Sequence, residues 1–349
     1  METLLQNYFG LFPLKIEKLN GYENINYLVK TNNHKYIFKT YSDVKVFQVL
    51  ISETEALNYL SEAKDFDSPK PIKFLDGSYV KRVIWNDTEI LIRLISFVEG
   101  DFIGELNVND NIVNSLGLML GKLNLKLQSW SNYTIKSREF EWNLDCFLMS
   151  KDYIDQIESF EDRKLVQYFF QQYEFEVLPI SGNLRKSIIH NDANEWNLLT
   201  KNGISSGIID FGDISYAALI NELAIAIVYI SYRESDYLHW AEKLIASYHS
   251  IIPLEELELK VLYYKISLRL CVSACNSAKA KKENPKNKYI THSESKVSNM
   301  LRAWIKISPY HAENRFRKVC GFKALKTPSI SSLISKRKKF FSSNISKLH

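Results

Sequence analysis

The order of hydrophobic and polar positions divides the chain into two parts of different character. Residues 1–95 contain short runs that alternate apolar and polar side chains, separated by turn residues such as Asn32-Asn33 and Asn86-Asp87, and such runs predict strands. The predicted strands are 16–19, 27–31, 35–41, 77–85 and 88–100. Residues 44–63 instead repeat apolar positions every three or four residues, which predicts a helix. The first part therefore predicts a small lobe of about five antiparallel strands with one helix.

From Val108 onward the spacing becomes that of helices, as in residues 108–127. Further helices are predicted within 136–176, from Ala217 onward, and on both sides of a basic loop within 268–305. We predict an α+β fold with two kinase-like lobes, of which the second is larger and mostly helical. The predicted domains are an N-lobe at 1–95, a hinge at 96–100, a C-lobe at 101–322 and a basic tail at 323–349.

Composition fits a packed globular protein and excludes several classes. The chain has 349 residues, of which 46% are hydrophobic and 24% charged, enough for a sizeable core. Its four cysteines are too few and too scattered for a disulfide scaffold. No signal peptide is expected in residues 1–20, and the most apolar run, 223–232, is about half a membrane span and predicts a core helix. These features predict a cytoplasmic protein.

Net charge is +5, but its distribution is uneven. Residues 323–349 hold seven Lys and Arg and no Asp or Glu, so the rest of the chain carries −2. The body of the protein is therefore not expected to bind nucleic acid. The Ser and Lys content of the tail predicts a mobile segment. Contact of the tail with an anionic surface, with Phe340 and Phe341 as apolar partners, is a second interpretation.

The most specific spacing lies between Ile188 and Gly212. His190, Asp192 and Asn197 form H-x-D-x-x-x-x-N, and Asp210 begins an Asp-Phe-Gly sequence. Together these are the two signatures of kinase-type phosphoryl transfer, which needs a carboxylate to orient the attacking hydroxyl and oxygen ligands for Mg²⁺.

Each of these four residues receives an expected role. Asp192 is the predicted base, while Asn197 and Asp210 are the predicted magnesium ligands. His190 is expected to brace the loop by hydrogen bonding. Between the two motifs, an Asn-Gly pair predicts a tight hairpin that would bring Asn197 and Asp210 together.

The N-lobe supplies candidates for nucleotide binding. Lys39, on the predicted strand 35–41, is expected to clamp phosphates. On the predicted helix Glu53 shares a face with apolar residues, so we expect Glu53 rather than Glu55 to pair with Lys39. Two segments complete the site. The first is a loop, residues 20–26, whose backbone amides would cover the phosphates, with the candidate residues Gly21, Tyr22, Glu23 and Asn24. The second is the hinge, whose main chain at Phe97 and Val98 would receive the base.

Four further residues are candidates for the acceptor site. Asp213 could contact the substrate or metal-bound water, or serve as the N-cap of a following helix. Glu195 would attract an amine and Trp196 would stack on its cation, although packing is an equal interpretation of the indole. Arg269 is the candidate for binding an acidic group such as a substrate carboxylate.

This sequence resembles the aminoglycoside-phosphotransferase-like (choline-kinase-like) family in two segments, HNDANEWNLL and, after it, GIIDFGDISYAALINELAIAI. Within it, the hydroxylysine-kinase-like branch, which includes kinase domains fused to class III aminotransferases, is most similar. The resemblance extends over residues 5–322 and adds Asn26 to the nucleotide-binding candidates. It implies a Mg²⁺-dependent kinase that uses ATP or GTP and phosphorylates hydroxylysine or a related amino alcohol. Asn191, where protein kinases usually have Arg, favours a small-molecule acceptor.

Two alternatives stay open at this point. One is a choline-, ethanolamine-, homoserine- or aminoglycoside-type kinase, which would differ only in its acceptor. The other is a non-catalytic scaffold with the kinase shape. The presence of every expected polar catalytic residue favours the enzyme.

Overall fold

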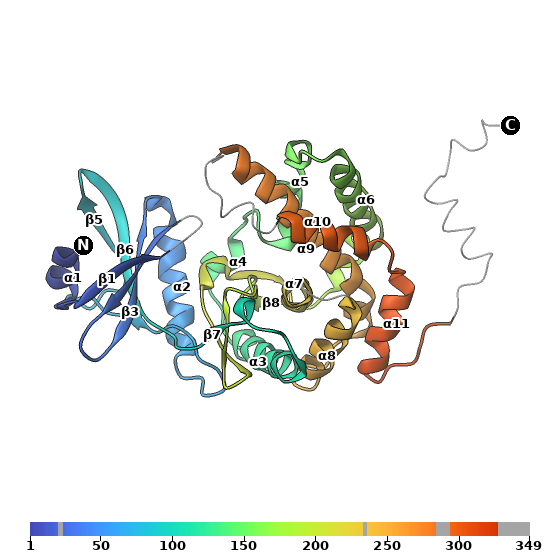
Figure 1. The fold of residues 1–349 in the computed structure, drawn as a ribbon, viewed down its shortest axis with the longest axis horizontal. Helices are drawn as coiled ribbons and strands as arrows, with labels where there is room; N and C mark the ends of the chain where they lie inside the picture. The colour runs from blue at the N-terminus through green and yellow to red at the C-terminus, as the bar shows by residue number, and fades with distance from the viewer. Residues whose placement is uncertain (20–23, 233–235, 284–293, 327–349) are drawn as a thin grey trace.

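The computed structural model describes residues 1–19, 24–232, 236–283 and 294–326 and has two lobes (Figure 1). Most of the tail and residues 20–23 of the predicted phosphate loop, residues 20–26, therefore lie outside the described residues. The N-lobe is an antiparallel sheet in the order β1-β2-β3-β6-β4, with β5 also paired to β6. Its strands are β1 (Lys15–Leu19), β2 (Ile25–Lys30), β3 (Lys35–Tyr41), β4 (Pro71–Ile72), β5 (Lys81–Trp85) and β6 (Thr88–Ser96).

Two helices accompany this sheet. The predicted helix is α2 (Phe47–Leu60), preceded by a 3-10 turn, η1 (Val44–Val46). A second helix, α1 (Glu2–Phe9), was not predicted because its apolar residues read as a loose alternation. It ends at Gly10, whose φ of 66° is a left-handed conformation that glycine adopts without strain. Its buried residues pack into the same core as strands β2 and β3.

The C-lobe is mostly helical, which confirms the predicted α+β fold class. Its helices are α3 (Asp110–Gln128), α4 (Tyr133–Ser137), α5 (Leu148–Lys151), α6 (Phe160–Glu176), α7 (Ile220–Ser231), α8 (Tyr237–His249), α9 (Glu256–Glu283), α10 (Glu294–Trp304) and α11 (Pro309–Val319). Its strands are β7 (Asp101–Phe102), β8 (Lys186–Ile189), β9 (Leu198–Lys201), β10 (Ile204–Ile208) and β11 (Ser215–Ala218). Five 3-10 turns connect them: η2 (Ile103–Glu105), η3 (Leu144–Cys146), η4 (Ile154–Gln156), η5 (Leu178–Asn183) and η6 (Phe211–Asp213).

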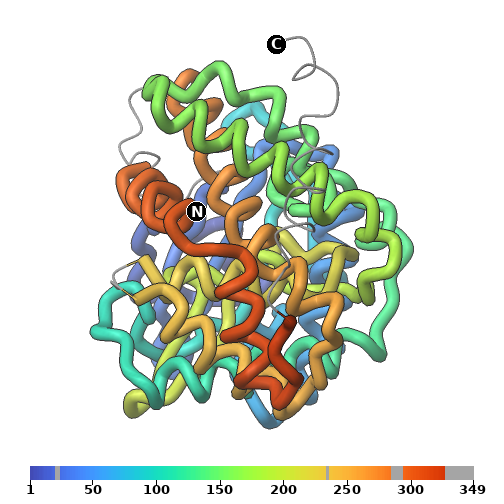
Figure 2. The backbone as a smooth tube through the Cα atoms, turned by 90° about the vertical axis from the view of Figure 1, so that its right-hand side faces the viewer, coloured from blue at the N-terminus to red at the C-terminus, as the bar shows by residue number. Residues whose placement is uncertain are grey.

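The C-lobe core is built around α7 and α9. All residues of α7 except Tyr229 are buried, as predicted for a core helix. Helices α10 and α11, orange to red in Figure 2, pack against α9, and α11 also packs against α8. Within the part of the chain that the structure describes, no helix has the length and apolar character needed to cross a membrane.

The predicted hairpin between the two sequence motifs is confirmed as β9 and β10. Asn202 and Gly203 both have positive φ, 53° and 74°, as a two-residue hairpin turn requires. At the open end the amide of Ile209 donates to the carbonyl of Asn197 at 2.9 Å. This contact holds the end of one motif beside the start of the other.

Candidate active site

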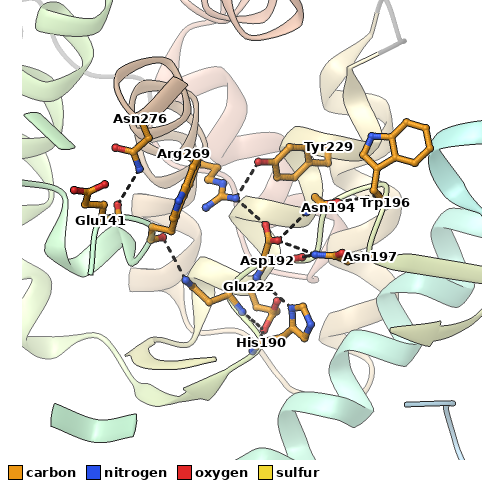
Figure 3. Close-up of polar contacts among 12 residues, drawn as sticks. Glu141, His190, Asp192, Asn194, Trp196, Asn197, Glu222, Tyr229, Arg269 and Asn276 are labelled. Carbon is orange, nitrogen blue, oxygen red and sulfur yellow. Dashed lines mark hydrogen bonds and ion pairs between the residues drawn. The ribbon is translucent and has the colours of Figure 1, made fainter. Parts of the chain in front are cut away.

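The loop between β8 and β9 carries the first motif, and His190 holds it in place (Figure 3). Its backbone amide donates to Glu222 Oε2 at 2.7 Å, and its Nδ1 accepts the amide of Asp192 at 3.2 Å. Because Nδ1 accepts, the proton of a neutral ring lies on Nε2, which is 3.0 Å from the carbonyl oxygen of Ile209. Burial lowers the pKa of His190, so the neutral form is favoured. His190 therefore links the loop of Asp192 to Glu222 of α7 and to Ile209.

Asp192 is held by polar contacts at both of its carboxylate oxygens. Oδ2 accepts from the side-chain amides of Asn194 at 2.8 Å and Asn197 at 2.7 Å. Oδ1 accepts from Nη2 of Arg269 at 3.0 Å. The Asp192 side chain nevertheless stays 20% exposed, so it is fixed in orientation and still accessible. Such a carboxylate is suited to orienting a hydroxyl group.

Asp210 stands at the point where the two lobes meet. It has a left-handed backbone, with φ of 60°, and its Oδ1 lies 3.0 Å from the Lys39 ammonium of the N-lobe. The charge of Lys39 lowers the pKa of Asp210, which is therefore ionised. Burial acts to lower the pKa of Lys39, but Asp210, Tyr41 and Glu53 together outweigh it and hold that pKa above its ordinary value.

The oxygens near Asp210 fit a hard divalent cation. Asn197 donates through its amide nitrogen to Asp192, which turns its amide oxygen away from Asp192. The Asp210 side chain is 49% exposed. One carboxylate and one amide oxygen resemble the few protein ligands that Mg²⁺ takes when phosphates supply the others. Among the described residues no group of three or more His, Cys, Asp and Glu could hold a metal by itself.

The expected pairing of Glu53 with Lys39 is wrong in this structure. Glu53 is buried on α2, as predicted, but its Oε1 accepts from Nη2 of Arg93 at 2.7 Å. Arg93 lies on β6 directly across from Lys39 on β3, and Arg93 occupies the position beside the Glu53 carboxylate that was expected for Lys39. Lys39 turns to Asp210 instead. Glu55 is exposed, and its Oε2 accepts from Nδ2 of Asn132 at 2.8 Å.

The remaining nucleotide-binding candidates are only partly described. Gly21, Tyr22 and Glu23 lie outside the described residues, and Asn24 directly precedes β2. Asn26 pairs with Lys39 across β2 and β3, and its buried Oδ1 has no hydrogen-bond partner in the described chain. These positions form a polar row across the sheet: Asn26, Lys39 and Arg93.

The predicted hinge follows β6. The amide of Phe97 donates to the carbonyl of Lys35 at 3.1 Å, so this amide is already used by the sheet. The side chains of Phe97 and Val98 are both half-buried.

The acceptor candidates lie around Asp192 with different surroundings. Glu195 is buried and pairs with Lys296 of α10 at 3.4 Å. Trp196 is half-buried, and its ring packs edge-on against Phe102 at 6.0 Å. Arg269 is buried on α9 and contacts Asp192, an arrangement that sequence reasoning did not predict.

Asp213 ends the turn η6. Strand β11 follows it, so its alternative interpretation as a helix N-cap is wrong. Burial, reinforced by the charge of Asp192, raises the pKa of Asp213 to about 8. Arg138 fixes this turn by donating to the carbonyl of Gly212 at 2.7 Å.

Glu222 on α7 supports the loop of Asp192, a role that was not predicted from the sequence. Besides the contact with His190, its second oxygen is buried without a partner among the described residues. Burial raises the pKa of Glu222 from 4.5 to about 7. Because the pKa of Glu222 is raised in the folded protein, its contribution to stability is fully present below its ordinary pKa, where the carboxyl group is protonated. That contribution is lost as the pH rises through about 7 and the buried group becomes charged.

We expect Glu222→Gln to melt at a higher temperature than the wild type at pH 8 and at a similar temperature at pH 5. A neutral amide still accepts from His190, and it avoids a buried charge that costs on the order of 3 kcal/mol. Thermal melts over this pH range would measure the difference. Glu258→Gln is the matched control, because Glu258 is buried but paired with Arg185 and its neutralisation should destabilise at pH 8. A variant less stable than the wild type at pH 8 would contradict the prediction.

Known proteins resemble this chain in sequence and in fold. The hydroxylysine kinase of Xenopus laevis is 26% identical over 296 residues, which cover 77% of this chain and 79% of that protein. The solved structure of a microcompartment-associated aminopropanol kinase superposes with a TM-score of 0.68 at 20% identity, covering 93% of this chain and 98% of that chain. The amicoumacin kinase hAmiN, solved with AMP-PNP, Ca²⁺ and Ami, also reaches 0.68, at 16% identity and over 88% of this chain and 93% of that chain.

A family model covers both halves of the site, from β1 of the N-lobe to the beginning of α9. It includes Lys39, the loop of Asp192 and the turn of Asp210. The match extends over residues 15–259, and this chain is a member of the phosphotransferase enzyme family.

Proposed function

We propose that this protein transfers the γ-phosphoryl group of ATP or GTP to a hydroxyl group of a small amino alcohol or hydroxy amino acid, such as hydroxylysine. The observation that supports this most directly is the fixed Asp192 carboxylate beside the Asp210–Lys39 pair. The names of the relatives support the acceptor class, because they include a hydroxylysine kinase and an aminopropanol kinase.

In the proposed reaction, Asp192 orients the acceptor hydroxyl and accepts its proton. The hydroxyl oxygen forms a bond to the γ-phosphorus as the bond from that phosphorus to the bridging oxygen breaks, and a nucleoside diphosphate leaves. Arg269, Asn194 and Asn197 keep the carboxylate of Asp192 in one orientation.

Asn197 and Asp210 would hold Mg²⁺, which neutralises charge on the phosphates when bound. Lys39 would then exchange Asp210 for phosphate oxygens, and Glu53 would act on it only indirectly, because Arg93 holds Glu53. Asn24 and Asn26, at the described end of the predicted loop 20–26, would lie over the phosphates. The main chain at Phe97 and Val98 would receive the base.

A panel of acceptors tests this function. Nucleotide consumption is measured with ATP and with GTP in the presence of Mg²⁺, for hydroxylysine, homoserine, choline, ethanolamine, aminopropanol and an aminoglycoside. We expect turnover with hydroxylysine-like acceptors. Turnover only with choline or an aminoglycoside would replace the proposed acceptor. A protein that binds nucleotide but phosphorylates none of them would support the non-catalytic scaffold.

A further inference from the structure

One face of α9 carries polar side chains that run away from Asp192. Arg269, Ser273 and Asn276 are spaced by four and three residues, so they lie on the same side of the helix. All three are buried, with at most 5% of the residue exposed. Figure 3 shows Arg269 directed at Asp192 and Asn276 farther along the same helix. Along the axis, seven residues of helix span about 10 Å.

Arg269 has hydrogen-bond donors that no group in the described chain accepts. Its Nη2 is used twice, by Asp192 at 3.0 Å and by the hydroxyl of Tyr229 at 2.9 Å. Its Nε and Nη1 are buried without a partner. The guanidinium lies near the rings of Trp142 and Tyr229, at 5.1 and 5.3 Å from their centroids. These contacts fix the group, and two of its nitrogens remain available for an acceptor.

The next residues along this face offer acceptors instead. Ser273 Oγ and Asn276 Oδ1 are buried without partners in the described chain. The amide of Asn276 donates from Nδ2 to the carbonyl of Glu141 at 3.4 Å. Because a carbonyl can only accept, this contact fixes which atom of the Asn276 amide is the oxygen. Free donors at Arg269 are thus followed by free acceptors at Ser273 and Asn276.

Buried polar atoms without partners are rare in native proteins, and each costs about 1–3 kcal/mol. Four such atoms lie on a single face beside the predicted base, and a ligand bound there would satisfy them. A ligand with a carboxylate and a neighbouring ammonium has the complementary charges. Nearby carboxylates are already engaged, since Glu141 pairs with Lys279 and Glu195 with Lys296. An ammonium would therefore bind to the neutral oxygens of Ser273 and Asn276.

We propose that this face of α9 binds the zwitterionic head of the acceptor, and that the acceptor is a hydroxy amino acid rather than an amino alcohol. Arg269 donates to the α-carboxylate from Nη1 or Nε, its two nitrogens without a partner, while Ser273 and Asn276 accept from the α-ammonium. The hydroxyl at the other end of the molecule lies at Asp192. This inference rests on the proposed function and narrows its acceptor.

The test compares hydroxylysine with the diamino alcohol that remains when its carboxyl group is removed. With the wild-type protein we expect kcat/KM to be at least about 100-fold higher for hydroxylysine, because the analogue leaves Arg269 without its acceptor. Asn276→Leu and Ser273→Ala should each raise KM for hydroxylysine about tenfold with little change in kcat. Both should also raise KM for the diamino alcohol, which keeps the amino group of the α-carbon, and neither should change the melting-temperature shift caused by nucleotide. Ser267→Ala is the matched control, since the hydroxyl of Ser267 already donates to the carbonyl of Tyr264 at 2.9 Å.

The possible outcomes distinguish a failure of this inference from a failure of the proposed kinase function. Equal kcat/KM for the two acceptors would overturn the inference and leave the proposed kinase intact. An unchanged KM for hydroxylysine in both folded variants would also overturn it. If the wild type phosphorylates neither compound although nucleotide still stabilises it, the proposed acceptor class fails and the inference fails with it. The wild-type comparison needs no variant, so it decides the matter even if a substitution disturbs folding.

Discussion

Replacing Asp192 by Asn should lower kcat by about 100- to 10 000-fold and leave nucleotide binding within a few-fold of the wild type. The substitution keeps the size of the side chain but removes the group that accepts the hydroxyl proton. It also places an amide where both oxygens now accept, from Asn194 and Asn197 on one side and Arg269 on the other. In either orientation of the new amide, its nitrogen, which can only donate, faces one of these donors, so the hydrogen bonds on that side are lost.

Steady-state kinetics and a nucleotide thermal shift on the same preparation measure these two effects. Asp65→Asn is the matched control, because it neutralises an exposed aspartate that pairs with Lys122, and its kcat should be normal. Near-normal kcat in a folded Asp192→Asn protein would remove Asp192 from the proposed role. A lost thermal shift would instead show that the substitution disturbed the nucleotide site.

Replacing Asp210 by Asn should abolish the metal-dependent part of nucleotide binding. The carboxylate is the only acidic member of the proposed metal pair, and without it the Lys39 ammonium also loses its partner. With nucleotide at 100 times its Kd, the wild type should gain about 2.7 kcal/mol of stability in the presence of Mg²⁺. The variant should show little of this gain, and turnover should fall with it.

Thermal shifts with and without Mg²⁺ distinguish Asp210 from Asp192. Asp192→Asn serves as the control for Asp210→Asn, since it should keep the metal-dependent shift and lose turnover. If Asp210→Asn kept the full shift with Mg²⁺, the metal would have to be held elsewhere.

The features predicted correctly from sequence are those encoded over short distances. The hairpin of β9 and β10 depends on an Asn-Gly pair, and the motif residues on either side of it follow from chain geometry. Burial of Glu53 follows from helical periodicity. Each of these needs only a few neighbouring residues to be specified.

The pairings that were missed depend on long-range register. Arg93 takes Glu53 because β6 pairs with β3 in the one register that sets Arg93 opposite Lys39. Arg269 meets Asp192 across 77 positions of sequence, through the packing of α9 against α7. A register shift of one residue would turn Arg93 to the other face of the sheet, and no local pattern fixes that register.

Helix α2 lies in the N-lobe and also packs against the C-lobe. Glu53 on it holds Arg93 of the N-lobe sheet, while Leu57 and Leu60 join the core cluster that extends through the C-lobe. The helix also touches η6, the turn that begins after Asp210. Pulling the lobes apart would expose leucines whose burial contributes about 1.5–3 kcal/mol each. Helix α2 therefore opposes separation of the two lobes at the turn that follows Asp210.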